Sequence, residues 1–148
     1  MLEDFIEINS LDAEIISFPT DAPASAPQVR KRFPSGSIAE TKLFSSPEND
    51  LFLIITLAGK KPSEEKVMSE TGQTELLEMN EDECFRLTGY KKGFLPPVSI
   101  FGVNVIIDSS LENKKYLFFR IKERAYLRIT LEEILAHNEN VSFAKITE

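Results

Sequence analysis

Lys42 is a residue whose type and setting could support chemistry. It lies in the alternating segment Ala39–Phe44 (AETKLF), which leads to the highly apolar run Leu51–Leu57. A lysine at the margin of a buried strand is a compact positive charge that can hold a phosphate or a carbonyl oxygen. The same alternation is more often a strand with one solvated face. Lys42 is therefore a candidate whose neighbours must decide its role.

The second candidate is the loop Gly89–Pro97 (GYKKGFLPP). Its glycines let the backbone approach a ligand closely and present N–H donors. Its double proline restricts one end, and Lys91 and Lys92 add positive charge to an acidic protein. A turn without function would have the same composition. The loop is a candidate binding element if it lies beside Lys42.

Nucleophilic and metal chemistry have little support. His137 is the only histidine and is expected near the end of the last helix, where a cation favours the helix dipole. Cys84 follows Glu81, Asp82 and Glu83, whose charges would raise the pKa of a thiol. We expect structural roles for both residues. One histidine, one cysteine and scattered carboxylates offer no ligand spacing, so we expect no metal and no cofactor.

The elements that must position these residues alternate between helix and strand patterns. We expect helices at Leu2–Ile8, about Ser25–Phe33, Ser63–Glu70, Asn80–Leu87 and from Thr130 onward. We expect strands at Glu14–Phe18, Ala39–Phe44, Leu51–Leu57, Leu76–Met79, Val103–Ile107, Tyr116–Ile121, Ala125–Ile129 and Val141–Ile146. This pattern predicts a mixed α/β (α+β) fold with hairpins as well as crossovers.

Several helix ends have recognisable caps. Ser25 is expected to be the N-cap of a helix with Pro27 in its first turn. Asn80 should cap the helix that ends before Gly89. Thr130, with Glu133 three residues later, forms a capping box.

Composition limits the function classes. The 148 residues suit one domain, and the formal net charge of −7 argues against a protein that coats DNA or duplex RNA. A small pocket for one RNA end is compatible with that charge. The acidic N-terminal segment MLEDFIEINS and the lack of an apolar run of about 20 residues predict a soluble, cytoplasmic protein without a membrane partner. A single cysteine fits a reducing compartment.

Three segments in this order resemble the YbaK family of prolyl-tRNA editing domains. Lys42, a polar turn and LFLIITLAG are similar to the family's lysine and hairpin. CFRLTGYKKGFLPP is similar to its "LTGY" segment, with the GxxxP loop on Gly93 and Pro97, and VNVIID to the strand that ends in an aspartate, here Asp108. YLFFRIKERAYLRITLEEIL resembles the closing hairpin and helix start. The resemblance covers about residues 25–135.

The resemblance implies a single editing domain over residues 1–148, with a mixed, mostly antiparallel sheet surrounded by helices. It implies a metal-free enzyme that hydrolyses mischarged aminoacyl-tRNA in trans, often tRNA for proline. The tRNA acceptor end is the implied partner, and an aminoacyl-tRNA synthetase is a further candidate. The implied catalytic set is Lys42, Gly93 and Pro97. Implied substrate-binding residues are Ser25, Gly89, Phe94, Ser99, Asp108, Phe119 and Ile121, and candidate RNA-backbone contacts are Arg30, Lys31, Lys91 and Lys92.

Two departures from the family pattern leave a second hypothesis open. Phe94 stands where the family usually has a second glycine, and Ile121 stands where its closing hairpin usually has one. Isoleucine removes room and makes a positive φ costly. The alternative to a deacylase is therefore a non-catalytic module that binds tRNA or a synthetase. A cleft filled by Phe94, Phe119 or Ile121 would favour the module, and an open cleft beside Lys42 would favour the enzyme.

Overall fold

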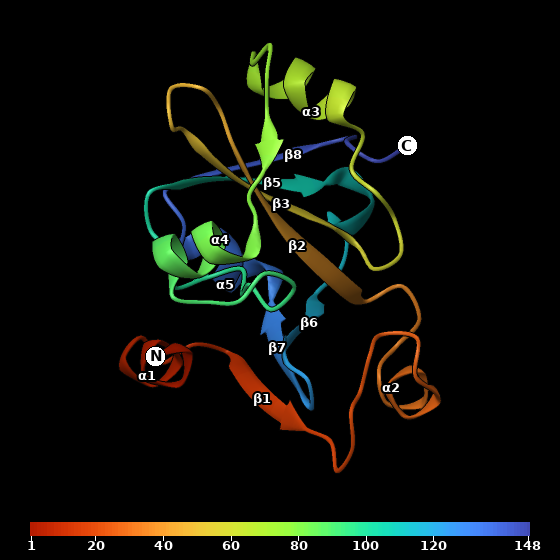
Figure 1. The fold of residues 1–148 in the computed structure, drawn as a ribbon. Coiled ribbons are helices and arrows are strands. Elements are labelled where there is room, and N and C mark those ends of the chain that lie inside the picture. Colours follow the sequence, from red (N-terminus) through yellow and green to blue (C-terminus); the bar gives the residue numbers. More distant parts are fainter.

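The structure, a computed structural model, describes residues 1–148 and is built on one eight-stranded sheet (Figure 1). The strand order is β1-β7-β6-β2-β3-β5-β8, and β4 pairs with β2 off this path. The strands are β1 (Ala13–Ser17), β2 (Ile38–Ser45), β3 (Leu51–Leu57), β4 (Leu77–Glu78), β5 (Val103–Asp108), β6 (Tyr116–Lys122), β7 (Ala125–Thr130) and β8 (Asn140–Ala144).

The sheet is mixed, as the sequence predicted. β1 with β7, β6 with β7, β2 with β3 and β2 with β4 pair antiparallel. β2 with β6, β3 with β5 and β5 with β8 pair parallel. The expected mixed α/β class, with hairpins and crossovers in one sheet, is confirmed.

Five α-helices and one 3₁₀ turn complete the chain: α1 (Leu2–Ile8), α2 (Pro27–Arg32), α3 (Glu64–Thr71), α4 (Glu81–Thr88), α5 (Leu131–Ala136) and η1 (Ser109–Leu111). Asn80 and Thr130 cap α4 and α5 as expected, and Gly89 ends α4 in the left-handed conformation. The expected cap at Ser25 is wrong. Ala26 is the N-cap of α2 and makes no side-chain cap bond, which leaves Ser25 one residue outside the helix. None of these helices is long and apolar enough to cross a membrane.

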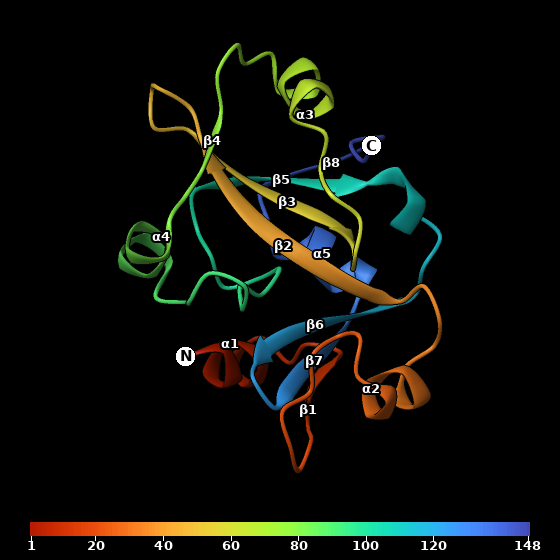
Figure 2. The ribbon, with the colours of Figure 1, turned by 45° about the vertical axis from the view of Figure 1, so that its right-hand side comes forward.

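The two faces of the sheet are covered differently. One face carries a continuous core of 23 buried residues, to which α1, α4, α5 and the segment 95–100 contribute. The other face carries two smaller clusters. One includes Phe44 and Val67, under α3, and the other includes Val29 and Phe33, at α2. Figure 2 shows α2 and α3 near opposite ends of β2, so the middle of this face has no helix over it.

β2 is also incompletely paired along one edge. Its start, Ile38 and Ala39, pairs with β6, and its end, Phe44 and Ser45, pairs with β4. No strand pairs on this edge between them, although β3 pairs with the whole of β2 on the other edge. Side chains alternate along a strand, so Glu40 and Lys42 share the face that bears the two small clusters. The gap in the edge and the gap between the helices coincide at these two residues.

Candidate active site

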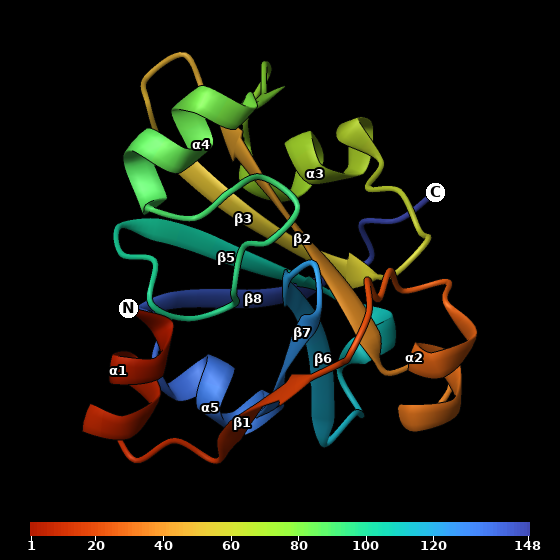
Figure 3. The same cartoon turned by 60° about the horizontal axis from the view of Figure 1, so that its bottom comes forward.

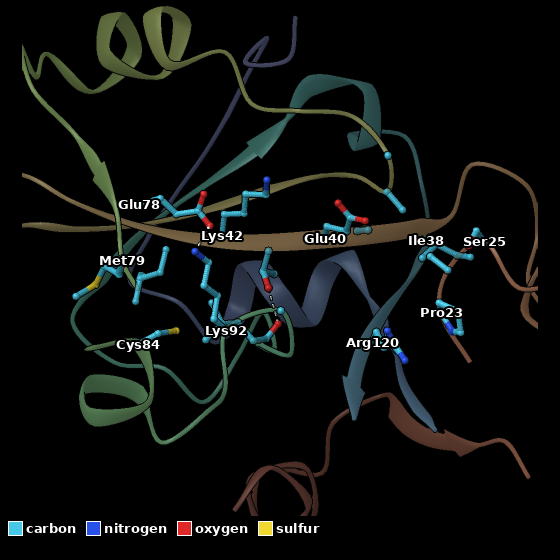
Figure 4. A pocket seen from close by; sticks show the side chains of 18 of the residues that line it. Pro23, Ser25, Ile38, Glu40, Lys42, Glu78, Met79, Cys84, Lys92 and Arg120 are labelled. Carbon is cyan, nitrogen blue, oxygen red and sulfur yellow. Dashed lines mark hydrogen bonds and ion pairs between the residues drawn. The ribbon is translucent and has the colours of Figure 1, made fainter. Parts of the chain in front are cut away.

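A cleft of about 700 Å³ opens at this double gap (Figure 4). Its floor is β2 from Ile38 to Leu43. Its walls come from the segment before α2, the turn after β3, strand β4 and the loop after α4. Residues separated by up to 97 positions in sequence, from Pro23 to Arg120, therefore meet around one strand edge. Concave clefts of this size are the usual binding sites for small molecules.

Glu40 and Lys42 give the floor of the cleft opposite charges. Both project from the same face of β2 (Figure 4), about 7 Å apart along the strand because residues i and i+2 are two rises apart. Lys42 is half-buried and Glu40 is exposed. Neither side chain makes an ion pair or a hydrogen bond within the protein, so both are available to a ligand. Sequence reasoning singled out Lys42 and missed Glu40, which the alternation of the strand placed on the same face.

The loop after α4 forms the wall nearest the floor. Thr41 points to the opposite side of β2 from Lys42, and its Oγ1 donates a buried hydrogen bond of 2.7 Å to the Leu95 carbonyl. Gly93 and Leu95 line the cleft. Gly93 has φ of 91°, in the region that strains every residue with a Cβ. The hydrogen bond from Thr41 to Leu95 holds this loop at a fixed distance from β2, the strand that carries Lys42.

The same loop holds unused backbone donors. The Phe94 N–H donates to the Lys91 carbonyl at 2.9 Å, which closes the turn. The N–H groups of Gly93 and Leu95, on either side of it, donate no hydrogen bond within the protein. Backbone N–H groups that line a cleft are the kind of donors that stabilise a developing oxyanion.

The wall at the other end of the cleft is held by a buried tyrosine. Tyr126 is fully buried, and its hydroxyl donates a hydrogen bond of 2.7 Å to the Ala22 carbonyl. Burial raises the pKa of Tyr126 to about 12, so it stays a neutral donor. This bond anchors the segment that brings Ser25 to the cleft. Arg120 from β6 closes this side through an ion pair of 2.6 Å with Asp21.

The cleft is more basic than the protein as a whole. It is lined by four cationic and two acidic side chains, Arg30, Lys42, Lys92 and Arg120 with Glu40 and Glu78. Lys92 Nζ lies 3.3 Å from Glu78 Oε2 and joins the loop to β4 at one end. Arg120 is paired with Asp21. Arg30 and Lys42 have no carboxylate partner and are the cations left to meet an anionic ligand.

Nucleophilic catalysis by Cys84 or His137 has no support in the structure. Cys84 lines the base of the cleft, but burial raises the pKa of the thiol. Thr88 and Lys92 lower that pKa by smaller amounts, and Glu78 raises it slightly further. A neutral thiol is a weak nucleophile. His137 lies outside the cleft, at the end of α5, with its ring edge-to-face against Phe5 at 5.9 Å. No group of three or more His, Cys, Asp and Glu side chains is arranged to hold a metal ion.

Comparison with known families now identifies the domain. The profile of the aminoacyl-tRNA editing domain matches residues 20–136, most of the chain. The chain belongs to this family. The editing-domain resemblance predicted from the sequence is thereby confirmed, and the domain is one that handles tRNA.

Solved structures agree on the fold of this editing domain. The hypothetical protein APE2540 is 17% identical, with 99% of each chain covered and a TM-score of 0.84. A proposed trans-editing enzyme for prolyl tRNA synthetase is 20% identical, with 99% of this chain and 94% of that chain covered and a TM-score of 0.84. At these identities the likeness establishes the fold alone. A comparison with curated proteins finds no significant match.

The editing domain brings five of the residues singled out from the sequence into one cleft. They are Lys42, Gly93, Ser25, Arg30 and Lys92. Lys31, on the same helix as Arg30, is exposed and does not line it. Phe119 is fully buried in the main core. Phe94, Ile121, Gly89 and Lys91 line a separate hollow on the other side of the loop.

Pro97 and Ser99 support the loop from outside the cleft. The Pro97 carbonyl accepts a hydrogen bond of 2.9 Å from Asn138 Nδ2, and this bond ties the loop to the segment after α5. Ser99 has a φ of 70°, and its Oγ accepts a hydrogen bond of 3.0 Å from the Tyr90 hydroxyl. Both residues hold the two ends of the loop at fixed positions. The structure thus gives them positioning contacts and places no part of them in the lining of the cleft.

Asp108 lies away from the cleft and its oxygens are occupied. It is 2% exposed, and it accepts hydrogen bonds from the Ser110 N–H and hydroxyl, the Ile146 N–H and the Thr147 hydroxyl. Burial alone would raise the pKa of this carboxyl, but these hydrogen bonds together outweigh it and hold the pKa below its ordinary value. Asp108 therefore fastens η1 and the C-terminal segment to β5, and it is not among the residues that line the cleft.

Asp108→Asn should lower the free energy of unfolding at neutral pH by about 1–3 kcal/mol, because an amide nitrogen would face donors. Since the folded pKa lies below the unfolded value of about 3.9, the stabilisation is present above that pH and is lost as pH falls through the folded pKa. Urea unfolding of both proteins from pH 7 to pH 2.5 measures this. A difference between the two proteins that does not shrink at the acid end would contradict it.

Proposed function

We propose that this editing domain hydrolyses aminoacyl-tRNA that carries the wrong amino acid, acting in trans on tRNA for proline. The open cleft beside Lys42 is the observation that carries the proposal. Its volume of about 700 Å³ suits an aminoacyl-adenosine end. The proposed trans-editing enzyme for prolyl tRNA synthetase, which shares the fold, supports proline tRNA as the substrate and a synthetase as a partner. Residues 1–148 would act as one domain.

The chemistry asked of the protein is modest. Water attacks the ester carbonyl carbon, the bond from that carbon to the ribose oxygen breaks, and the amino acid leaves with a free carboxylate. An aminoacyl ester is already activated, so orientation and oxyanion donors can supply the rate. Lys42 would hold the reacting end by its charge, with the Gly93 and Leu95 N–H groups as donors to the oxyanion. The neighbouring ribose hydroxyl would assist the attacking water, as the family resemblance implies.

The non-catalytic alternative loses the feature that motivated it. Phe119 lies in the core, and Phe94 and Ile121 line the separate hollow. None of the three fills the cleft beside Lys42. The two departures from the family pattern therefore alter a surface next to the cleft and leave the cleft itself open.

A stable analogue tests where the substrate binds. An adenosine carrying the amino acid through a 3′-amide cannot be hydrolysed as an ester, and a structure of its complex would locate both parts. The proposal places the amide carbonyl within hydrogen-bond reach of Lys42 and of the Gly93–Leu95 segment. An analogue bound elsewhere, or no binding at millimolar concentration, would contradict it.

Glu40 would recognise the free α-ammonium group of the aminoacyl ester. It is the only acidic residue on the floor and lies two residues from Lys42 on the same face. The wild type should prefer proline tRNA mischarged with alanine over the N-acetyl form of the same tRNA, and Glu40→Gln should reduce that preference about tenfold, a modest figure because Glu40 is exposed. The measurement is kcat/KM for both substrates with both proteins. The same preference in the variant would show that Glu40 does not contact the amine.

A further inference from the structure

A second hollow, here called the side hollow, lies against the outer side of the loop after α4. It has a volume of about 680 Å³ and is lined by residues of α4, of that loop, of the end of β6 and of the turn between β6 and β7. Figure 3 shows where these elements lie in the ribbon. The residues that matter here are Phe85, Lys91, Phe94, Ile121, Lys122 and Arg124. The side hollow therefore combines aromatic rings with positive charge. The cleft beside Lys42 has cationic side chains but no aromatic ring in its lining.

The side hollow adjoins the cleft at the contact between two residues, Phe94 and Arg120. Phe94 lines the side hollow, while its neighbours Gly93 and Leu95 line the cleft. The Arg120 guanidinium lies 5.4 Å from the centre of the Phe94 ring and also lines the cleft. A polynucleotide whose last residue occupies the cleft would meet this Phe94–Arg120 contact as it leaves.

The chemistry of the side hollow matches single-stranded nucleic acid. Phe85 is 54% exposed, a large apolar ring on the surface of α4. Lys91, Lys122 and Arg124 are exposed and make no ion pair, and Glu123 is the one acidic residue of the lining. Aromatic faces stack on bases while nearby cations meet the phosphates, which is the usual combination in proteins that hold unpaired nucleotides.

We propose, on the basis of the proposed function, that the side hollow binds the unpaired nucleotides that precede the terminal adenosine of tRNA. Phe85 and Phe94 offer stacking faces to the bases, and Lys91, Lys122 and Arg124 contact the phosphates. Phe94, at the position where the family usually has glycine, thus gains a role outside the cleft. The acidic remainder of the protein would leave the RNA duplex largely untouched.

Binding of uncharged RNA tests this without any ester. The probes are an acceptor-stem hairpin with its four unpaired 3′ nucleotides and the same hairpin with a blunt end. Phe85→Ala should weaken binding of the first hairpin between about fivefold and a hundredfold, the range for one lost base stack, and should leave the second nearly unaffected. Phe85→Tyr, which keeps the ring, and Leu87→Ala, an exposed apolar residue of the same helix, are the controls.

Charge gives a second, independent readout. Lys122→Gln and Arg124→Gln should each reduce the slope of log affinity against log salt by about 0.7. Equal loss for both hairpins, or no loss with Phe85→Ala, would overturn the proposal. So would a Phe85→Ala defect confined to binding of prolyl-tRNA synthetase, since the side hollow would then be a protein-docking site. Because the probes carry no amino acid, these results stand whether or not the protein hydrolyses aminoacyl-tRNA.

Discussion

Lys42→Ala is expected to lower kcat/KM for deacylation by about 100-fold to 1,000-fold, the usual effect of removing one preorganised group that stabilises an oxyanion. Lys42 is half-buried at the floor of the cleft and has no partner within the protein. Its charge is therefore free to act on the ester, and alanine leaves only water in its place. Single-turnover hydrolysis of a mischarged tRNA, with enzyme in excess, measures the effect on the chemical step.

Two variants make this result specific. Lys42→Arg keeps the charge on a longer, planar group and should retain part of the activity, because arginine places its donors differently. Lys145→Ala removes an exposed lysine that does not line the cleft and should leave the rate unchanged. Activity of Lys42→Ala within threefold of the wild type would show that Lys42 is an ordinary solvated residue of β2.

Thr41→Val is expected to reduce both stability and activity through the loop. Valine has nearly the shape of threonine but cannot donate to the Leu95 carbonyl, whose 2.7 Å bond is buried. Leaving that carbonyl without a donor should lower the free energy of unfolding by about 1–3 kcal/mol. A shift of the loop by about 1 Å relative to Lys42 can cost about 100-fold in kcat/KM. Urea unfolding and single-turnover hydrolysis measure the two effects.

Thr41→Ser provides the matched control. Serine keeps the hydroxyl and loses only a methyl group, so the loop should stay in place and most activity should be retained. The bond would be irrelevant to the site if Thr41→Val and Thr41→Ser had equal rates of hydrolysis. The assays are run 20 °C below the melting temperature of Thr41→Val. If the variant is partly unfolded even there, its loss of activity is a stability effect, which the unfolding curves identify.

Local patterns in the sequence predicted the elements well. The apolar run at β3, the alternation of β2 and the caps at Asn80 and Thr130 depend on neighbours within a few residues, and each is found in the structure. The cap at Ser25 failed because Pro27 fits a first turn whichever residue precedes it, and the chain uses Ala26 without a side-chain bond.

The site depends on pairings that no local pattern encodes. The cleft exists because β6 and β4 pair with opposite ends of β2, both from positions more than 30 residues later in the chain. Which loop residues face the cleft depends on the Thr41–Leu95 bond, so Gly93 lies inside while Phe94 lies outside. Glu40 could have been found from the alternation alone, because it shares a face with Lys42. Asp108 is a polar residue whose structural bonds come from the distant C-terminal segment.

The central claim is that the open cleft hydrolyses the aminoacyl ester of tRNA. Proline tRNA charged in turn with alanine, serine, cysteine and proline, together with correctly charged alanine tRNA, forms a suitable panel. The account predicts that the wild type hydrolyses at least one mischarged proline tRNA far above the spontaneous rate and spares the correctly charged tRNAs, and that Lys42→Ala abolishes most of this excess. Spontaneous rates across the whole panel, with a folded protein that binds tRNA, would contradict it.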